Sequence, residues 1–324
     1  MLDTSARADT DNPAFAEAVL TGLSRAPKAV SSAWLYDHEG SALYEAITRL
    51  PEYYVARTET RILERWAGAM AARLPAGAAV IEYGAGAAIK TRLLLDAMER
   101  PACYAPLDIS AEFLLEASEE IAAHYPDITV TPIVAHFLEP NPLSEIRGRG
   151  KRVGFFPGST VGNLTNAEIG HFFDLCRQQL GADGKLLLGA DRAKDRSILI
   201  PAYDDAAGVT ARFNLNLLAR INRELAGTFN LRRFRHEARW NPELSRIEMH
   251  LVSLAEQEVR VLDHEFGFEE GETIHTEISR KFRSGELEAL AAANGWQVEH
   301  HWTDDRAYFS VFLFRQAPPA PAKV

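Results

Sequence analysis

The strongest constraint on the fold is a regular alternation of short apolar strands and helical segments between residues 58 and 190. The predicted strands are Ala79–Tyr83, Cys103–Leu107, Thr129–Val134, Arg152–Phe156 and Lys185–Ala190. Strands that alternate with helices form parallel sheets, because each helix returns the chain to the edge where the next strand begins. The pattern therefore predicts a doubly wound parallel α/β domain.

The segments between these strands have the apolar spacing of amphipathic helices. Predicted helices cover Thr58–Ala72, Thr91–Arg100 and Ala111–His124. Thr165 and Glu168 have the spacing of a capping box, a hydroxyl at the N-cap and an acid three residues later, and predict a helix that continues to Leu180.

After Asp191 the pattern changes. A long helix is predicted over Asp204–Leu225, and the alternation of polar and apolar residues that follows is typical of antiparallel strands. These predicted strands are Arg246–Leu254, Glu258–Glu265 and Thr273–Phe282. A helix over Glu286–Asn294 and strands over Trp296–Trp302 and Tyr308–Phe314 would complete a seven-stranded sheet.

The change of pattern predicts two discontinuous domains. Residues 56–194 and 282–316 would form the α/β domain, and residues 13–55 and 195–281 an α+β domain. Residues 1–12 and 317–324 are poor in large apolar groups and are predicted to be disordered.

Charge and cysteine content limit the partners of the chain. The 324 residues include 35 Lys and Arg against 45 Asp and Glu, a formal net charge of −10, which argues against a nucleic-acid partner. Two cysteines are too few for a disulfide framework, and we expect reduced, buried thiols. The sequence also lacks a signal-like N-terminus and an apolar run long enough for a membrane span, so a cytoplasmic location without a membrane partner is expected. We also expect a monomer.

A glycine-containing turn follows the first predicted strand. Gly84 and Gly86 would let a ligand approach the backbone, and three interpretations compete. The dinucleotide fingerprint and the P-loop both require a glycine at position 89, which is Ile89. A pocket for S-adenosylmethionine needs no complete phosphate cradle, and Asp108, at the end of the second strand, has the position of a ribose-binding carboxylate.

A second loop follows the fourth predicted strand. Gly158, Ser159, Gly162 and Asn163 would lie beyond the carboxyl end of this strand, where ligands bind in open α/β sheets. Taken alone, the same loop is equally consistent with an ordinary turn.

Several longer strings resemble the histidine Nα-methyltransferase family of ergothioneine biosynthesis. They are the segments 50–54, 57–59, 84–91, 158–165, 202–210, 246–249 and 276–282. The resemblance extends from about Pro27 to Arg315 and implies a class I, Rossmann-like methyltransferase sheet with a substrate domain. It also implies trimethylation of the histidine α-amine to hercynine, with S-adenosylmethionine as the methyl donor.

The resemblance assigns roles to residues of this chain. It implies that Tyr53, Asn163 and Tyr203 hold the α-carboxylate and α-amine of histidine. Glu277 and Ser279 would contact the imidazole, with Met249 in the same pocket, and Tyr36 and Tyr44 would line the amine end. The implied cofactor contacts are Gly84, Gly86, Lys90, Asp108 and Phe137.

One position departs from the family pattern. Family members commonly place an acid before the phenylalanine that follows strand three, where it contacts the adenine amine. In this chain the pair is His136 and Phe137. A neutral imidazole can accept a hydrogen bond from that amine, whereas a protonated one cannot.

The spacing of the residues agrees with the implied substrate. Glu277 and Ser279 lie two residues apart on a predicted strand and therefore share a face, so that a carboxylate and a hydroxyl can meet two nitrogens of one imidazole. Asn163 is expected to position the amine for transfer, and either Tyr36 or Tyr203 to orient it or relay its proton. A metal ion is not expected, since His300 and His301 lack acids or thiols at ligand spacing.

Two other functions remain open at this point. The chain could methylate a different free amino acid, because a fold does not set the substrate. It could also bind the cofactor as a regulatory protein without turnover.

Overall fold

The computed structural model describes residues 12–86, 88–140, 143, 146 and 151–318. The chain separates into two compact units. Residues 54–194 and 280–324 form the large-sheet unit, and residues 1–53 and 195–279 form the small-sheet unit. The ends predicted to be disordered lie almost entirely outside the described residues.

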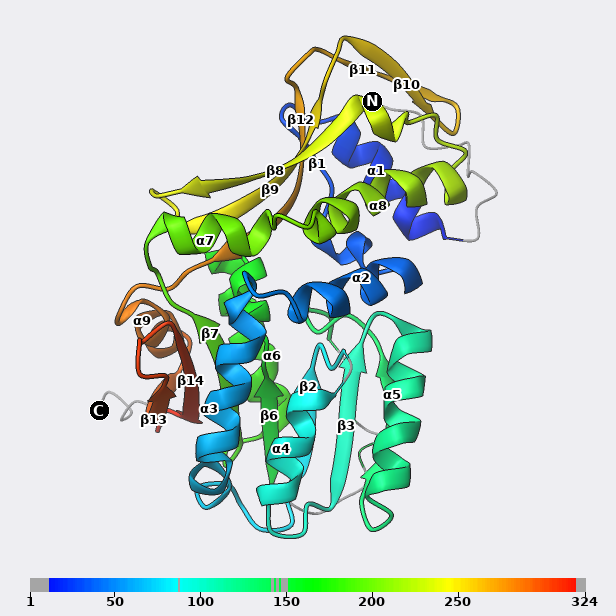
Figure 1. Ribbon diagram of the computed structural model, residues 1–324. Helices are drawn as coiled ribbons and strands as arrows, with labels where there is room; N and C mark the ends of the chain where they lie inside the picture. Colours follow the sequence, from blue (N-terminus) through cyan, green and yellow to red (C-terminus); the bar gives the residue numbers. More distant parts are fainter. Residues whose placement is uncertain (1–11, 87, 141–142, 144–145, 147–150, 319–324) are drawn as a thin grey trace, which may run out of the picture. The chain divides into compact units, whose positions relative to one another are not determined.

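The large-sheet unit contains a mostly parallel sheet with the strand order β13-β14-β7-β6-β2-β3-β4, in which β5 also pairs with β3 (Figure 1). The strands are β2 (Ala79–Tyr83), β3 (Cys103–Asp108), β4 (Thr129–Val130), β5 (Ile133–Val134), β6 (Arg152–Phe156), β7 (Lys185–Asp191), β13 (Trp296–Thr303) and β14 (Phe309–Gln316). In this sheet β14 pairs antiparallel with both β7 and β13, and the other described strand pairs of the sheet are parallel. The order confirms the predicted seven-position sheet, and it reverses between β2 and β6, which is where such sheets bind ligands.

The predicted strand over residues 129–134 is divided into the two short strands β4 and β5. Pro132 lies between them, and a proline has no amide hydrogen to donate to the ladder. The other four predicted parallel strands agree with β2, β3, β6 and β7 to within one residue.

Helices cover both faces of the large sheet. They are α3 (Tyr54–Ala71), α4 (Ile89–Ala97), α5 (Ala111–His124), α6 (Asn166–Leu180), α9 (Glu286–Ala293) and the 3-10 helix η3 (Thr160–Asn163). In Figure 1, α3 and α4 cross in front of the strands and α6 lies behind β6. The core on the α6 side is aromatic and contains Phe156, Phe172, Phe173 and Trp296. The predicted capping box is confirmed, because Thr165 Oγ1 accepts from the Glu168 amide and the Thr165 amide donates to Glu168.

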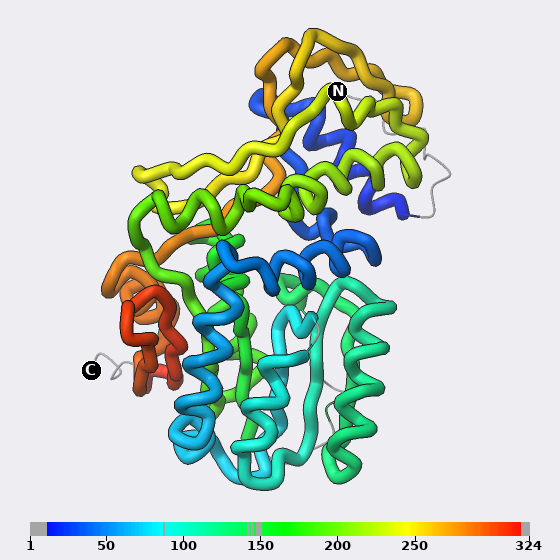
Figure 2. Tube along the Cα trace, viewed as in Figure 1, coloured from blue at the N-terminus to red at the C-terminus, as the bar shows by residue number. Residues whose placement is uncertain are grey.

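The small-sheet unit contains a sheet with the order β1-β12-β9-β8 and a separate hairpin, β10-β11 (Figure 1). In Figure 2 the chain of this unit can be followed by colour, from the blue N-terminal segment through the green and yellow segments to the orange one. The strands are β1 (Lys28–Ala29), β8 (Phe234–Asn241), β9 (Arg246–Ser253), β10 (Gln257–Val261), β11 (His264–Phe268) and β12 (Thr273–Arg280), whose last residue belongs to the other unit. The helices are α1 (Pro13–Leu23), α2 (His38–Thr48), α7 (Arg196–Tyr203), α8 (Val209–Glu224), and the 3-10 helices η1 (Ser32–Leu35) and η4 (Leu231–Arg233).

Two predictions for the small-sheet unit were wrong. The helix expected over 204–225 does not begin at Asp204. Instead α7 ends at Tyr203 and α8 begins at Val209, because Asp205 accepts from the Val209 and Thr210 amides and Gly208 has a φ of 68°. The single strand expected over 258–265 is the β10-β11 hairpin, which turns at Leu262 and Asp263.

Both faces of β9 matter for the site described below. Ile247, Met249 and Leu251 share one face and are buried, as their spacing predicts. The alternate residues Arg246, Glu248 and His250 therefore share the other face. None of the helices among the described residues has the length and apolar content needed to cross a bilayer.

Candidate active site

The turn after β2 has the geometry that its glycines predict. Gly84 and Gly86 have φ values of 70° and 50°, a region that side chains with a Cβ rarely adopt. The amides of Gly84 and Ala85 both donate to the Leu107 carbonyl of β3. A Cβ added at Gly84 would lie 4.0 Å from Thr160 Cγ2, so the turn is adjacent to the loop after β6.

Asp108 ends β3 beside this turn. Its two carboxylate oxygens accept from the Gly86 amide (3.2 Å) and the Ser110 amide (3.0 Å). Two backbone amides therefore fix the orientation of the carboxylate, while each oxygen retains a further lone pair for a hydroxyl donor. This is the placement expected for a ribose-binding acid.

Glu82, two residues before the turn, is buried and accepts hydrogen bonds from Thr91 Oγ1 and Tyr104 Oη. Burial raises the pKa of Glu82 to about 7, because the charged form is poorly solvated there. Sequence reasoning did not single out this carboxylate. An acid inside an otherwise apolar strand was the available signal.

Lys90 forms an internal ion pair. Its Nζ lies 2.5 Å from Oε2 of Glu59, which is 1% exposed, and the same oxygen accepts from the Gly158 amide at 2.8 Å. The pair connects the start of α4 and the helix α3 to the loop after β6. The ion pair thus stabilises the turn before α4 and the loop after β6, both of which contain predicted site residues.

His136 and Phe137 follow β5 and stack on each other with ring centroids 4.8 Å apart. Burial lowers the pKa of His136, so its ring is neutral at pH 7. His136 Nδ1 accepts from the Leu138 amide at 3.2 Å, which places the ring proton on Nε2. The free side of the ring therefore presents a donor, rather than the acceptor expected opposite the adenine amine.

Asn163 is the last residue of η3, beyond the carboxyl end of β6. The preceding Ser159 has a φ of 59°, and its hydroxyl accepts from the Asp191 amide of β7 at 2.9 Å. This contact fixes the loop to the neighbouring strand. The structure thereby brings the loop of Asn163 and the Gly84 turn together at the switch point of the large sheet.

A buried cluster of charges lies at the end of β7. Asp191 Oδ2 accepts from Tyr54 Oη (2.6 Å) and lies 2.9 Å from Lys281 Nζ, and Asp191 Oδ1 lies 2.6 Å from Lys194 Nζ. Asp191 and Lys281 are both 0% exposed. The two ammonium groups hold the pKa of Asp191 below its usual range, whereas burial lowers the pKa of Lys194 to about 8. Sequence reasoning missed this cluster, because Tyr54 and Lys281 are distant from Asp191 along the chain.

The predicted tyrosines of the small-sheet unit form one aromatic cluster. Tyr36 and Tyr44 lie 5.5 Å apart, Tyr44 and Tyr53 6.4 Å apart, and Tyr53 and Tyr203 5.9 Å apart, measured between ring centroids. Phe213 of α8 packs against Tyr36 and Tyr44 and was not predicted. These rings come from separate helices and loops, so no local sequence motif predicts the cluster.

Burial and the neighbouring phenols raise the pKa of Tyr53 well above its usual value. Tyr53 is therefore a neutral hydroxyl at any physiological pH and can donate a hydrogen bond to an anion.

Tyr203 also contacts a residue predicted at the opposite end of the substrate. Its hydroxyl lies 2.8 Å from Ser279 Oγ of β12, within hydrogen-bond distance. A buried chain of hydrogen bonds supports Tyr203 from behind. Thr276 donates to Asn214 Oδ1 (2.6 Å), Asn214 Nδ2 donates to His236 Nδ1 (2.9 Å), and His236 Nε2 donates to the Tyr203 carbonyl (2.8 Å).

This order of donors requires a neutral His236, and burial does lower its pKa. Asn214 was not predicted, although a fully buried amide inside an amphipathic helix is a usable signal.

The remaining predicted residues lie on neighbouring strands of the small sheet. Met249 of β9 is 2% exposed, and its carbonyl oxygen lies 3.1 Å from Thr276 Oγ1. Glu277 of β12 is half-buried. All the side chains predicted for the imidazole thus belong to the small-sheet unit, together with the four tyrosines. Asn163 and the predicted cofactor contacts belong to the large-sheet unit.

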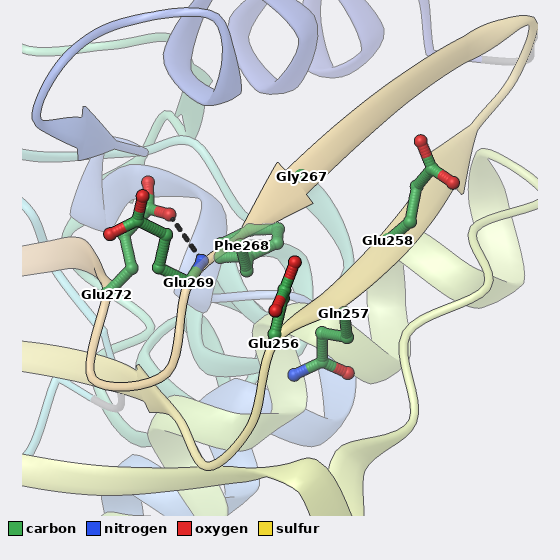
Figure 3. A pocket seen from close by; sticks show the side chains of 7 residues that line it. All are labelled: Glu256, Gln257, Glu258, Gly267, Phe268, Glu269 and Glu272. Carbon is green, nitrogen blue, oxygen red and sulfur yellow. Dashed lines mark hydrogen bonds between the residues drawn. The ribbon is translucent and has the colours of Figure 1, made fainter.

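A hollow lies beside the β10-β11 hairpin (Figure 3). Its lining is acidic and consists of Glu256, Gln257, Glu258, Gly267, Phe268, Glu269 and Glu272. Lys28 pairs with Glu272 and lies over the Phe268 ring. No predicted substrate or cofactor residue is among these, so the hollow is not part of the candidate site.

The strand order, the glycine turn and the carboxylate at the end of β3 define a Rossmann-like methyltransferase of class I. The model of the family described as "Histidine-specific methyltransferase, SAM-dependent" matches residues 15–316. The chain belongs to this family.

Two histidine N-alpha-methyltransferases match nearly the full length of the chain. The chain is 43% identical over 311 residues to the histidine N-alpha-methyltransferase of Mycolicibacterium smegmatis. The match covers 94% of this chain and 96% of the relative. It is 39% identical, with the same coverage of both chains, to the histidine N-alpha-methyltransferase of Mycobacterium tuberculosis. It is 30% identical over 207 residues to ergothioneine biosynthesis protein 1 of Neurospora crassa, which covers 62% of this chain and 24% of the relative.

Proposed function

We propose that the protein transfers methyl groups from S-adenosylmethionine to the α-amine of L-histidine until hercynine is formed, as a step of ergothioneine biosynthesis. The observation that carries the proposal is the convergence of Tyr36, Tyr44, Tyr53 and Tyr203 with Ser279 in one unit of a chain that belongs to the histidine-specific family. The two mycobacterial relatives are named for the same reaction.

The large-sheet unit would hold the methyl donor. Asp108 suits the ribose hydroxyls because its carboxylate is fixed by two amides, and the Gly84 turn lets the cofactor approach the backbone. The stacked His136 and Phe137 offer an apolar face and one N–H donor to the adenine. The cofactor supplies a sulfonium-bound methyl group, and the protein supplies orientation.

The amine must be neutral to attack the methyl carbon. An α-amine has a pKa of about 8, so a useful neutral fraction exists near neutral pH without a strong base. Most of the rate should come from positioning, in which Asn163 holds the amine and Tyr36 or Tyr203 orients it. The neutral hydroxyl of Tyr53 suits the α-carboxylate.

The aromatic cluster also suits the product. Each methylation makes the head group larger, and the third leaves a permanent cation that no longer donates hydrogen bonds. Aromatic faces attract such a cation through their quadrupoles, so tyrosines favour the amine through all three steps.

At the other end, Glu277 and Ser279 would bind the imidazole. A carboxylate and a hydroxyl can meet the two ring nitrogens, and Met249 supplies an adaptable apolar wall. The hydrogen bond between Ser279 and Tyr203 would then be exchanged for one to the ligand.

Isothermal titration with histidine in the presence of S-adenosylhomocysteine tests this assignment. Glu277→Ala should weaken histidine binding by about 10- to 100-fold, since a hydrogen bond to a charged group is lost, and should leave cofactor binding unchanged. Tryptophan and tyrosine serve as competing ligands for the alternative that another amino acid is the substrate. Histidine affinity that does not respond to Glu277→Ala would refute the imidazole assignment.

Turnover is tested separately by mass spectrometry after incubation with labelled S-adenosylmethionine. Mono-, di- and trimethylated histidine are the expected products. An absence of any methylated small molecule would favour the regulatory alternative.

We also propose that the chain acts as a cytoplasmic monomer and that methyl transfer itself uses no metal ion. Cys103 and Cys176 are free, buried thiols, which suits a reducing compartment. Light scattering of the purified protein should give the mass of one chain.

A further inference from the structure

Three side chains with metal-binding atoms meet on the small sheet, outside the residues used above. Glu248 and His250 lie on β9, and His275 lies on β12. One ligand atom from each residue lies within 4.8 Å of the other two. Glu248 and His250 alternate with the core residue Met249 and therefore share a face of the strand.

His250 is the unexplained member. The residue is 7% exposed, and neither Nδ1 nor Nε2 has a hydrogen-bond partner within the part of the chain that the structure describes. Its Nε2 lies 3.5 Å from Glu248 Oε2, beyond a normal hydrogen bond, and its ring stacks on His275 at 4.8 Å between centroids. A buried imidazole with two unpaired nitrogens is costly unless something else occupies them.

The two neighbours are held as metal ligands usually are. Glu248 Oε1 accepts from Asn241 Nδ2 (3.1 Å) and Arg246 Nε (2.7 Å), which leaves Oε2 directed toward His250. His275 Nε2 donates to the Glu277 carbonyl at 3.1 Å, so its Nδ1 carries the lone pair. Outer hydrogen bonds of this kind fix the tautomer of a ligating histidine and the orientation of a ligating carboxylate.

We propose that Glu248 Oε2, His250 Nε2 and His275 Nδ1 form a binding site for a divalent transition metal ion of the zinc class. Zinc binds nitrogen and oxygen ligands at about 2.0–2.2 Å in a tetrahedron, which places ligand atoms about 3.3 Å apart. The separation of 3.5 Å between Glu248 and His250 is already close to this value. Three protein ligands leave a fourth position for water or another small ligand.

The local charge and the type of ligand atom together decide which metals this site would select. Arg239 and Arg246 flank the cluster, and Glu237 and Glu248 pair with them, so the surroundings have no net negative charge. Neutral imidazoles suit Zn²⁺, Co²⁺, Ni²⁺ and Cu²⁺, whereas Mg²⁺ and Ca²⁺ require more oxygen ligands.

Calorimetric titration of the tag-free, EDTA-treated and desalted full chain with ZnCl₂ tests the proposal. Free histidine must be absent, because it chelates zinc. We expect one ion per chain, no binding of MgCl₂, and a visible absorption band of tetrahedral Co²⁺ when CoCl₂ replaces zinc. Folded wild-type protein that does not bind zinc would overturn the proposal.

Variants locate the ion. The Kd for zinc should rise by more than about tenfold in each of the variants His250→Gln, His275→Gln and Glu248→Gln. Tenfold is the smallest loss of affinity expected when a residue that only hydrogen-bonds to a metal ligand is removed, and a ligand itself should matter more. The matched control is His264→Gln, which removes an exposed histidine of the same unit and should leave the Kd unchanged. Thermal unfolding in EDTA verifies that each variant is folded. Equal zinc affinity of the control and any folded ligand variant would place the ion elsewhere and refute the assignment.

Discussion

The two units hold their predicted site residues by different means. In the large-sheet unit, buried carboxylates do this: Glu59 pairs with Lys90, Glu82 accepts from Thr91 and Tyr104, and Asp191 pairs with two lysines. In the small-sheet unit, aromatic rings and a chain of neutral hydrogen bonds position Tyr203 and its neighbours. Removing one partner of a buried ion pair, or changing its protonation, lowers the stability of a protein more than removing one neutral hydrogen bond. Sensitivity to charge and pH should therefore be concentrated in the large-sheet unit.

The largest effect is expected from Lys281→Met. Removal of one partner of a buried ion cluster leaves Asp191 incompletely compensated, and the free energy of unfolding should fall by about 3–5 kcal/mol. Chemical denaturation measures it. Lys151→Met is the control, because Lys151 pairs with Asp183 at the surface and its loss should cost at most about 1 kcal/mol. Equal losses for the two variants would remove the contrast between buried and surface charge.

A smaller effect should distinguish Glu82→Gln from the wild type as the pH changes. The pKa of Glu82 is near the ordinary glutamate value of 4.5 in the unfolded chain but about 7 in the folded protein. Between these pH values the folded state binds more protons, so the contribution of Glu82 to stability is lost as the pH rises, by up to about 3 kcal/mol.

Urea unfolding at pH 4.5, 5.5 and 7 measures this contribution. The difference in unfolding free energy between wild type and Glu82→Gln should decrease across the series. Parallel pH curves for the two proteins would show that Glu82 ionises normally.

The smallest effect is expected in the small-sheet unit, from Tyr203→Phe. The variant keeps the aromatic ring and loses the hydrogen bond to Ser279, which should lower the free energy of unfolding by about 1 kcal/mol at every pH. Histidine binding should weaken by about fivefold while S-adenosylhomocysteine binding stays unchanged, as calorimetry can show. A loss comparable to that of Lys281→Met would contradict the comparison.

The sequence predicted the large-sheet unit better than the small-sheet unit, for a physical reason. Strands buried on both faces appear as continuous apolar runs, and turns such as Gly84–Gly86 have local signatures. The start of α8 was predicted too early because an acid such as Asp204 or Asp205 also suits the first turn of a helix. The hairpin turn at Leu262 was missed because a leucine with a φ of 53° has no turn signature.

The candidate site shows the same division. Gly84, Asp108 and Asn163 follow strands, so their position could be predicted from the sheet topology alone. The tyrosines could be proposed only through the family resemblance, because they lie far apart along the chain. Phe213, Asn214 and the Asp191 cluster were predicted neither from the topology nor from the resemblance, because their contacts join residues that only the three-dimensional structure brings together.

The buried cluster around Asp191 has a consequence for how the chain is connected. The polypeptide passes between the units after Tyr53, after Lys194 and after Ser279. Tyr54, Lys194 and Lys281, which stand at these three passages, all bind the one carboxylate of Asp191. Every covalent link to the small-sheet unit thus begins within two residues of a side chain that is bound to Asp191.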